Sequence, residues 1–317
     1  MKPNGDRGYH TDTTDLGFAC PIIMPSRIRP VARTLHATRR LAAAMARRML
    51  FVTRTLYCNI RRIRHTPQDN ELAYQCNICG RNSYAPIAHL TREEKTCLCG
   101  SSVRLRALIH VLSLELFGSS LTLPNFPLRR DLVGIDMSGA ATYAQRLSKR
   151  LGYTNTFLHK SPRLDITEPN SSWIENCDFV ISSDVFEHVA PPIERAFTNT
   201  FQILKPGGVF VLTVPYTPVG DTVEHFPDLY EYRIERSNGK WVLLNTTREG
   251  ILQEFDNLVF HGGDGETLEL RIFSKRGVLS ELQRAGFVDI NIHKETVSDF
   301  GILWPQEWSL PISARRP

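Results

Sequence analysis

Apolar positions in the second half of the chain alternate between two periods. Short apolar runs at residues 177–182 and 209–214 have the length and composition of buried strands. Between them, residues 193–204 repeat apolar side chains at helical spacing, namely at Ile193, Phe197, Phe201 and Leu204. The following Lys-Pro-Gly-Gly, residues 205–208, predicts the helix end because proline cannot continue a helix and glycine permits reversal. Strand, helix and strand together predict a parallel βαβ unit whose ligand crevice lies beyond the carboxyl ends of its strands.

The same periodicities extend the pattern in both directions. They predict strands at residues 131–136, 153–159 and 287–293 and helices at residues 101–117, 140–151 and 275–285. A long insertion, residues 216–274, precedes the last helix. It contains a predicted hairpin, residues 232–236 against 240–244, that turns at Asn238-Gly239. A connection of this length above the carboxyl edge is typical of a lid over a binding site.

Length and composition limit the class of protein. A chain of 317 residues accommodates one sizeable α/β core and a small accessory unit. No apolar stretch approaches the roughly 20 residues of a membrane span, and the start does not resemble a secretory signal. The seven cysteines are odd in number and four are clustered, which favours a reducing cytoplasm over a disulfide framework. Cys20, Cys58 and Cys177 stand alone and fit small buried apolar residues.

The formal net charge of +5 is unevenly distributed. Residues 16–68 contain eleven arginines and no acidic residue, so the rest of the chain is net acidic. Apolar positions from Val31 to Ile63 predict an amphipathic helix within a basic, partly disordered arm, residues 1–68. Such a helix suits the anionic inner surface of a membrane, or RNA. It equally suits packing on the rest of the protein with solvated arginines, or an internal start at Met45 or Met49.

Four cysteines form two close pairs, Cys76 and Cys79, then Cys97 and Cys99, each pair followed by a glycine. Four thiolates in two pairs match the tetrahedral ligand set of structural zinc. The second pair has one intervening residue where zinc ribbons usually have two, and the alternative is four reduced, packed cysteines. We predict a zinc-ribbon-like segment with a joining helix at residues 69–118, followed by the main domain at residues 119–317.

The paired motifs around the βαβ unit at residues 177–214 resemble the corresponding region of class I S-adenosylmethionine (SAM) methyltransferases. These enzymes are often grouped as methyltransferase type 11. The matching residues are Asp178, Ser182, Ser183, Asp184, Glu187, His188, Leu204, Lys205, Pro206, Gly207, Gly208 and Pro215. The likeness extends more weakly from about Asp131 to about His293, and the C-G-S-x-x-R-x-R-A-L run after the cysteines is similar to cysteine-rich members. The resemblance implies a Rossmann-like α/β fold with a mostly parallel seven-stranded sheet.

The resemblance also implies where SAM would lie. The turn after the first strand contributes Gly134, Asp136, Ser138 and Gly139, although the family's G-x-G-x-G is absent. In an alternative alignment, residues 134–138 follow the second strand, where Asp136 would hold the ribose. Asp165 matches the acid on the adenine side, or is a turn residue. Ser183 and Asp184 follow the fourth strand, where Asp184 otherwise caps the next helix.

Methyl transfer to oxygen or nitrogen often needs a base, and an imidazole titrates in the suitable range. The candidates are His188, His225 and His261, of which His188 in the Glu-His pair is the first choice; each also fits a hydrogen-bonded structural histidine. The predicted substrate residues are Glu187, Tyr216 and Glu224. Glu187 alternatively orients His188.

These patterns lead to one main hypothesis and two alternatives. The main one is a SAM-dependent methyltransferase acting on oxygen or nitrogen of a small-molecule or glycan-type biosynthetic intermediate, with structural Zn²⁺. The second is an RNA methyltransferase whose ribbon and arm bind phosphates. The third is a non-catalytic zinc-bearing scaffold, which the missing glycine-rich loop would explain.

Overall fold

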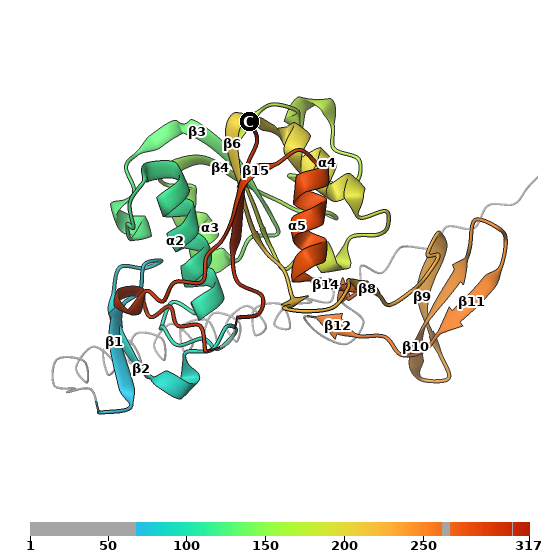
Figure 1. Cartoon of the computed structure of the whole chain (residues 1–317), viewed down its shortest axis with the longest axis horizontal. Helices are drawn as coiled ribbons and strands as arrows, with labels where there is room; N and C mark the ends of the chain where they lie inside the picture. Colours follow the sequence, from blue (N-terminus) through green and yellow to red (C-terminus); the bar gives the residue numbers. More distant parts are fainter. Residues whose placement is uncertain (1–67, 262–266, 306) are drawn as a thin grey trace, which may run out of the picture. The chain divides into compact units, whose positions relative to one another are not determined.

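A six-stranded sheet lies at the centre of the structure, a computed structural model that describes residues 68–261, 267–305 and 307–317 (Figure 1). The predicted arm helix lies outside these residues. The strands run in the order β15-β16-β6-β5-β3-β4. Their bounds are Arg129–Met137 for β3, Leu151–Thr156 for β4, Cys177–Ser183 for β5, Leu204–Thr213 for β6, Val288–Ile292 for β15 and Ile312–Arg315 for β16. Strands β4, β3, β5 and β6 are parallel, and β16 is antiparallel to both of its neighbours. This is the Rossmann-like arrangement that the sequence predicts.

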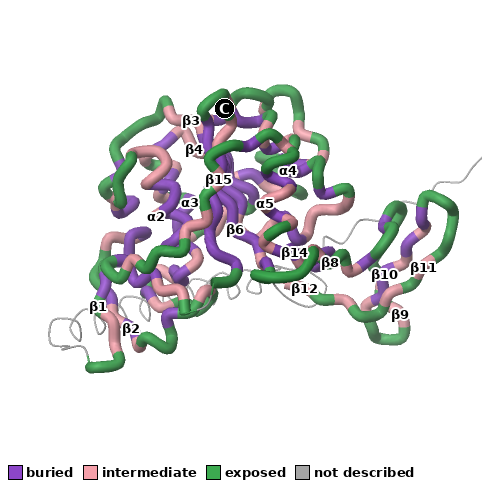
Figure 2. The backbone as a smooth tube through the Cα atoms, in the orientation of Figure 1, coloured by how far each residue is buried: buried purple, intermediate pink, exposed green. Residues whose placement is uncertain are grey.

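The two faces of the sheet are covered by different helices. Helices α2 (Val103–Phe117) and α3 (Ala141–Leu147) share one apolar cluster with Phe179 and Ile181 of β5. Helices α4 (Glu194–Ile203) and α5 (Lys275–Arg284) share another with Val180. Successive side chains of a strand point to opposite faces, so a strand covered on both sides is apolar throughout. Figure 2 shows the resulting buried centre.

The structure corrects several predicted elements. The sheet has six strands where seven were expected, because residues 157–176 contribute only a bridge between Phe157 and Arg163. Pro162 and Pro169 cannot donate to a sheet ladder, which disfavours a strand here. The segment predicted as a strand at 153–159 begins two residues earlier and ends at Thr156. The helix predicted at 140–151 ends at Leu147, because β4 already begins at Leu151.

The Lys-Pro-Gly-Gly segment also differs from its prediction as a turn. Helix α4 ends at Ile203, and residues 204–208 are already the first part of β6. Gly207 takes a φ of 79° there, a conformation open to glycine at little cost. Strand β3 pairs with both β4 and β5, which makes it the central first strand and excludes the alternative alignment of residues 134–138.

The cysteine-rich segment begins with an antiparallel hairpin, β1 (Glu71–Gln75) and β2 (Asn82–Pro86), followed by the 3-10 turn η1 (Ile87–His89). Arg106 of α2 is fully buried beneath it and donates to the carbonyl oxygens of Ser101 and Gly301. Its guanidinium carbon lies 4.8 Å from the centre of the Tyr74 ring. Hairpin, helix and C-terminal segment therefore share one core. The 3-10 turns η2 (Leu123–Asn125), η3 (Ser171–Trp173) and η5 (Ser298–Phe300) complete the connections.

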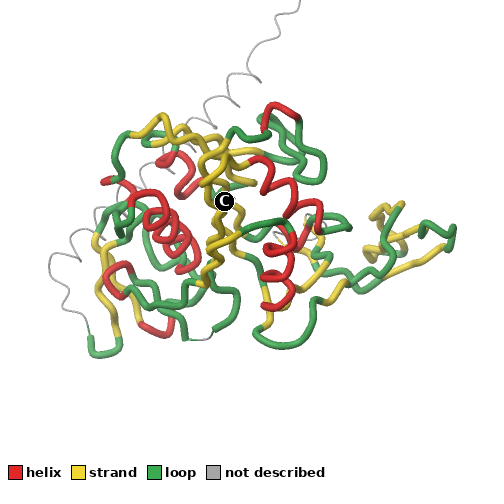
Figure 3. Tube along the Cα trace, turned by 45° about the horizontal axis from the view of Figure 1, so that its top comes forward, coloured by secondary structure: helices red, strands yellow, loops and turns green. Residues whose placement is uncertain are grey.

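The insertion forms strands of its own, separate from the central sheet (Figure 3). They are β7 (Tyr216–Thr217), β8 (Val223–Glu224), β9 (Glu231–Ser237), β10 (Lys240–Thr246), β11 (Leu252–Phe255), β12 (Phe260–His261), β13 (Thr267–Leu268) and β14 (Arg271–Ser274). Strands β9 and β10 form the predicted hairpin. Asn238 and Gly239 both have positive φ, as a two-residue type I′ turn requires. None of the described helices is long and apolar enough to cross a bilayer.

Candidate active site

The carboxyl ends of β3, β4 and β5 meet at one edge of the sheet because these strands are parallel. Asp136 lies near the end of β3 and is completely buried. The Tyr153 hydroxyl donates to its Oδ2 at 2.9 Å, whereas Oδ1 has no hydrogen-bond partner among the described residues. Burial raises the pKa of Asp136 to about 7, against the opposing effect of the nearby Tyr143 and Tyr153 hydroxyls. A buried carboxyl thus lies directly beneath the turn.

The turn after β3 is built from small residues. Ser138 has a φ of 60°, in the region that glycine favours. A Cβ on Gly139 would lie 2.0 Å from Asp136 Oδ2, so only glycine fits there. Asn155 of β4 accepts from the Gly139 amide and donates to the Gly139 carbonyl, both at 2.8 Å. The sequence analysis missed Asn155, and its position near the end of a strand was the available signal.

Gly134 has a different role from the rest of that predicted group. A Cβ at Gly134 would lie 2.3 Å from ring atoms of Phe179 on the neighbouring strand. Gly134 is therefore needed for packing inside the sheet, and it lies three residues before β3 ends at Met137. Its place in the core gives no direct support for contact with a cofactor.

Two arginines from the cysteine-rich segment and α2 reach the end of β5. Arg92 binds both carboxylate oxygens of Asp184, at 2.7 and 3.0 Å, and Arg104 Nε lies 3.1 Å from Oδ2. Burial alone would raise the pKa of Asp184, but the two guanidinium groups outweigh it and hold that pKa below its ordinary value. Arg104 also donates to the Ser183 hydroxyl at 2.6 Å. Asp184 is thus an ion-pair partner, not the helix cap considered from the sequence.

Asp165 lies in the loop after β4 and forms a local turn. Its Oδ1 accepts from the backbone amide of Thr167 at 3.1 Å and from the Thr167 hydroxyl at 2.7 Å. Arg163 Nη2 lies 3.5 Å from Oδ2. These contacts match the turn role that the sequence left open, and a role toward the cofactor stays a prediction.

The Glu-His pair after β5 forms the short 3-10 turn η4 (Phe186–His188). Glu187 is fully buried, and neither carboxylate oxygen has a hydrogen-bond partner among the described residues. Burial, followed by the charge of Asp184, raises the pKa of Glu187 to about 8. His188 donates from Nδ1 to the Leu268 carbonyl at 2.8 Å. Burial lowers the pKa of His188 and so favours the neutral imidazole.

The insertion brings the other two predicted histidines to this turn. His261 Nδ1 lies 3.2 Å from His188 Nε2. Glu269 binds both insertion histidines, with Oε1 2.8 Å from His225 Nε2 and Oε2 3.1 Å from His261 Nε2. We name these five residues, Glu187, His188, His225, His261 and Glu269, the His/Glu cluster. Sequence reasoning missed Glu269 because its Thr-Leu-Glu-Leu surroundings read as an ordinary strand edge.

Arg271 fixes the η4 turn from beneath. Its side chain is fully buried, and Nη1 donates to the carbonyl oxygens of Phe186 and Val189 at 2.8 and 2.6 Å. Nε donates to Glu224 Oε1 at 2.7 Å, so Glu224 is an ion-pair partner. Tyr216 is only 2% exposed and its hydroxyl accepts from the Leu310 amide. Two of the three predicted substrate residues, Tyr216 and Glu224, therefore have structural partners in this conformation.

The four clustered cysteines converge as the spacing predicts. Their Sγ atoms all lie within 4.8 Å of one another, with Cys76 to Cys99 at 3.7 Å and Cys79 to Cys97 at 3.6 Å. The glycine after each pair, Gly80 and Gly100, has positive φ. None of the described cysteines forms a disulfide, and Cys177 is buried as expected of a small apolar residue.

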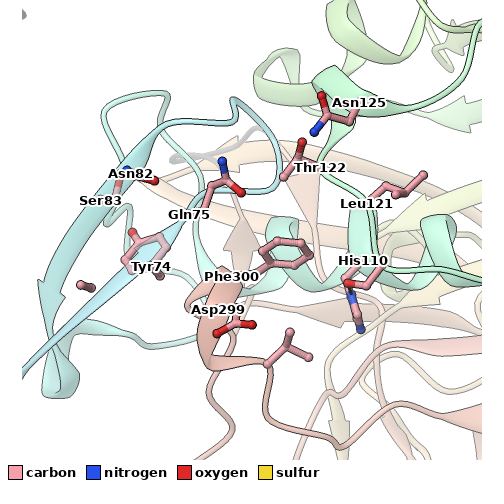
Figure 4. A pocket seen from close by; sticks show the side chains of 13 residues that line it. Tyr74, Gln75, Asn82, Ser83, His110, Leu121, Thr122, Asn125, Asp299 and Phe300 are labelled. Atoms are coloured by element: carbon pink, nitrogen blue, oxygen red, sulfur yellow. Dashed lines mark hydrogen bonds between the residues drawn. The ribbon is translucent and has the colours of Figure 1, made fainter.

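A cavity of about 870 Å³ lies beside the β1–β2 hairpin (Figure 4). It is lined by Ala73, Tyr74, Gln75, Asn82, Ser83, His110, Ser120, Leu121, Thr122, Asn125, Val297, Asp299 and Phe300. A second, of about 260 Å³, is lined by Pro191, Pro192, Glu224, Phe226, Pro227, Asp228, Leu229, Tyr230 and Arg248. No residue at the carboxyl ends of β3, β4 or β5 lines the first cavity. The second adjoins the η4 turn and the insertion, which places it on the side of the His/Glu cluster.

Residues 118–210 match the family model of a methyltransferase domain. This segment runs from the end of α2 into β6 and includes every strand end described above. These residues therefore form a methyltransferase domain. The family-model match thus agrees with the motif pair around β5 and β6, and the strand order supplies the Rossmann-like arrangement on which those motifs depend.

Several solved methyltransferase structures are similar to this one. A 1,6-didemethyltoxoflavin-N1-methyltransferase from Burkholderia thailandensis, solved with 1,6-didemethyltoxoflavin and S-adenosylhomocysteine, is 15% identical, with 68% of this chain and 77% of that chain covered and a TM-score of 0.36. A SAM-dependent methyltransferase from Mesorhizobium loti is also 15% identical, with 69% and 100% covered and a TM-score of 0.41. The amino pentose methyltransferase CalS10 from Micromonospora echinaspora is 16% identical, with 69% and 93% covered and a TM-score of 0.38. Likeness at this level carries no argument about the acceptor. No curated protein matches the chain.

Proposed function

We propose that this methyltransferase transfers the SAM methyl group to an oxygen or nitrogen of a small-molecule or glycan-type biosynthetic intermediate. The observation that carries the proposal is the His/Glu cluster, which joins the turn after β5 to the insertion. An imidazole at that position suits an acceptor that must lose a proton. The insertion supplies two histidines and a carboxylate, so it contributes most of the proposed acceptor side.

The turn after β3 fits a bound cofactor. SAM, when bound, supplies a methyl group made electrophilic by a sulfonium cation. Ser138 and Gly139 let the backbone approach it closely, and Asn155 holds that backbone in place. The unpartnered Oδ1 of Asp136 lies beneath the turn. We propose Asp136, Ser138 and Gly139 for the methionine side of SAM, with Gly134 supporting them from within the sheet, and Asp165 for the adenine side. Ser183 and Asp184 would border its reactive end.

We propose His188 as the group that takes the acceptor's proton. Its Nδ1 donates to a carbonyl oxygen, which leaves the lone pair of the neutral ring on Nε2. That lone pair faces His261 Nδ1 across 3.2 Å, so an acquired proton would be shared between the two rings. Glu269 contacts both His261 and His225 and would hold the two rings in position. Once ionised, Glu187 would offset the imidazolium charge, and Arg271 would keep the turn in place through the carbonyl oxygens of Phe186 and Val189.

We further propose that the four cysteines bind structural Zn²⁺. Four thiolates without an open position match a closed tetrahedral site. Zinc there would brace the loop that carries Arg92 to Asp184. Reduced thiols also suit the cytoplasm, which we propose as the compartment. The arm on which the RNA and membrane alternatives depend lies outside the described residues.

Calorimetric titration of the full, zinc-loaded chain with SAM and S-adenosylhomocysteine tests the cofactor. We expect saturable heat with both, and a folded chain that binds neither would overturn the proposal in favour of the scaffold alternative. Transfer of labelled methyl from SAM to panels of phenols, amino sugars and RNA then tests the acceptor. Labelling of RNA alone, lost when residues 1–68 are removed, would replace the small-molecule proposal by the RNA alternative.

A further inference from the structure

Two imidazole lone pairs face each other in the His/Glu cluster. A carbonyl oxygen only accepts hydrogen bonds, so His188 carries its proton on Nδ1, toward Leu268. His261 Nε2 lies 3.1 Å from Glu269 Oε2, and a carboxylate only accepts, so this contact favours the His261 tautomer with its proton on Nε2. The remaining nitrogens, His188 Nε2 and His261 Nδ1, are then both acceptors at 3.2 Å. Two acceptors at this distance need a positive charge between them.

A third acceptor lies beside these two nitrogens. Glu187 Oε1 is 3.7 Å from His188 Nε2, and the Glu187 side chain is fully buried. Neither of its oxygens has a hydrogen-bond partner among the described residues. Leaving a buried carboxyl group without a hydrogen-bond partner costs free energy, and a bound cation would supply the missing partner. The three ligand atoms, one from each residue, all lie within 4.8 Å of one another.

We propose that Glu187, His188 and His261 bind a divalent transition-metal cation, of the class that includes Zn²⁺ and Co²⁺, separate from the four-cysteine site. Tetrahedral zinc with bonds of about 2.0–2.1 Å places neighbouring ligand atoms roughly 3.4 Å apart. The separations of 3.2 and 3.7 Å bracket that value. Two imidazoles and one carboxylate are the ligand set of zinc and of other divalent transition metals.

The surroundings also match those of metal-binding histidines. Such histidines usually donate their second ring nitrogen to a carbonyl or carboxylate, which fixes the tautomer and the ring direction. His188 does so through Leu268 and His261 through Glu269. Glu269 is itself held by His225, and the backbone amide of Leu270 donates to the Glu187 carbonyl. Glu187 and His188 belong to η4, whereas His261 belongs to the insertion. The bound cation would therefore link the insertion to the turn after β5.

This inference affects the proton transfer proposed above but does not rest on it. A lone pair engaged by a metal cannot take a proton. With the cation bound, an acceptor hydroxyl or amine that joins it would lose its proton more readily, because a cation lowers the pKa of a coordinated group. The base role of His188 then belongs to the metal-free chain. Metal binding is measured without SAM or acceptor, so its failure is distinguishable from failure of methyl transfer.

Metal content by mass spectrometry tests the site on the full chain, after chelation and reloading with Co²⁺. We expect the wild type to hold one equivalent more than Glu187→Gln and His261→Ala. The equivalent that the variants lose should lack sulfur-to-cobalt charge-transfer absorption, whereas the one they retain in the four-cysteine site should show it. Glu269→Gln should keep the stoichiometry but weaken the affinity about 10- to 100-fold.

His293→Ala is the matched control, because His293 contacts Ser313 and none of the His/Glu cluster residues. It should hold as much cobalt as the wild type. Circular dichroism establishes that each variant is folded before its metal is counted. Equal cobalt content in the wild type, Glu187→Gln and His261→Ala would overturn the proposal and leave a shared proton as the charge between the rings.

Discussion

At the scale of single residues, two carboxyl groups near the edge of the sheet are buried at a cost in free energy. Asp136 and Glu187 are both fully buried, and each has a carboxyl oxygen without a hydrogen-bond partner among the described residues. Burial disfavours the ionised form, which is why the pKa of Asp136 rises to about 7 and that of Glu187 to about 8. Perturbed carboxyls of this kind gather at functional sites.

The raised pKa of Asp136 makes stability depend on pH. Between pH 4 and 7 the folded chain retains a proton on Asp136 that the unfolded chain has released. The unfolding free energy contributed by this residue therefore falls as pH rises through that window. In Asp136→Asn the contribution disappears, so its difference from the wild type should change by up to about 4 kcal/mol across the window. Urea unfolding at several pH values measures it, and parallel curves for the two proteins would contradict the assignment.

Two neighbouring substitutions in the turn after β3 should act in opposite directions. Gly139→Ala places a methyl group against Asp136 and Tyr153, which should cost about 1–3 kcal/mol of stability and weaken SAM binding. Ser138→Gly relieves the left-handed φ of 60° and should leave both intact or improved. Thermal unfolding and SAM calorimetry measure the pair. A Gly139→Ala variant that binds SAM as tightly as the wild type would contradict the placement of the cofactor at this turn.

At the scale of elements, the cysteine-rich segment is tied to β5 by charge. Arg92 is only 9% exposed and Asp184 18% exposed, so the pair is largely removed from water. Arg104 of α2 joins the same carboxylate and also binds Ser183. These ion pairs therefore hold a loop of the cysteine-rich segment against the edge where the cofactor is proposed.

Breaking this tie should destabilise the fold markedly. Arg92→Ala leaves Asp184 buried with a single guanidinium, and we expect a loss of about 3 kcal/mol. In a cycle with Asp184→Asn, the double variant should lose about 1–3 kcal/mol less than the sum of the single variants. Arg233→Ala is the control, because its pair with Glu235 is exposed and should contribute less than about 1 kcal/mol. Additive losses in urea unfolding would mean that Arg92 acts through packing alone.

At the scale of the described unit, residues 66–317, several regions distant in sequence support one edge. The cysteine-rich segment supplies Arg92, α2 supplies Arg104, and the insertion supplies His225, His261 and Glu269. Arg92 and Arg104 reach Asp184 at the end of β5, and His261 reaches His188 in the η4 turn that follows it. We therefore expect the proposed zinc site to affect the proposed cofactor region although no cysteine lies in it.

Removing the proposed zinc should affect the carboxyl edge of the central sheet. Chelation at neutral pH should lower the thermal midpoint and weaken SAM binding at least several-fold, because the loop carrying Arg92 would lose its brace. Cys76→Ser should reproduce both effects, whereas Cys177→Ser, in the core of β5 and outside the cluster, should lower stability without changing zinc content. Unchanged SAM affinity in the zinc-free chain would separate the ribbon from the cofactor site.

Much of the fold can be predicted from the sequence because it depends on interactions between neighbouring residues. Apolar runs of strand length predict β5 and β6, and the Asn238-Gly239 pair predicts the β9–β10 hairpin through its positive φ values. The cysteine spacing predicts the convergence of the four thiols. The Glu-His pair points to His188. In each case the physical cause lies within a few neighbouring residues.

The sequence by itself therefore determined the methyltransferase domain, the order of most elements and the residue types at the edge. Only the tertiary structure decided which of them meet. Arg92 and Asp184 are 92 residues apart, and His188 and His261 are 73 apart, so no local pattern records either contact. The missing seventh strand, the burial of Tyr216 and the role of Glu269 are likewise settled by packing. Burial and charge pairing depend on the whole core, and spacing along the chain does not contain them.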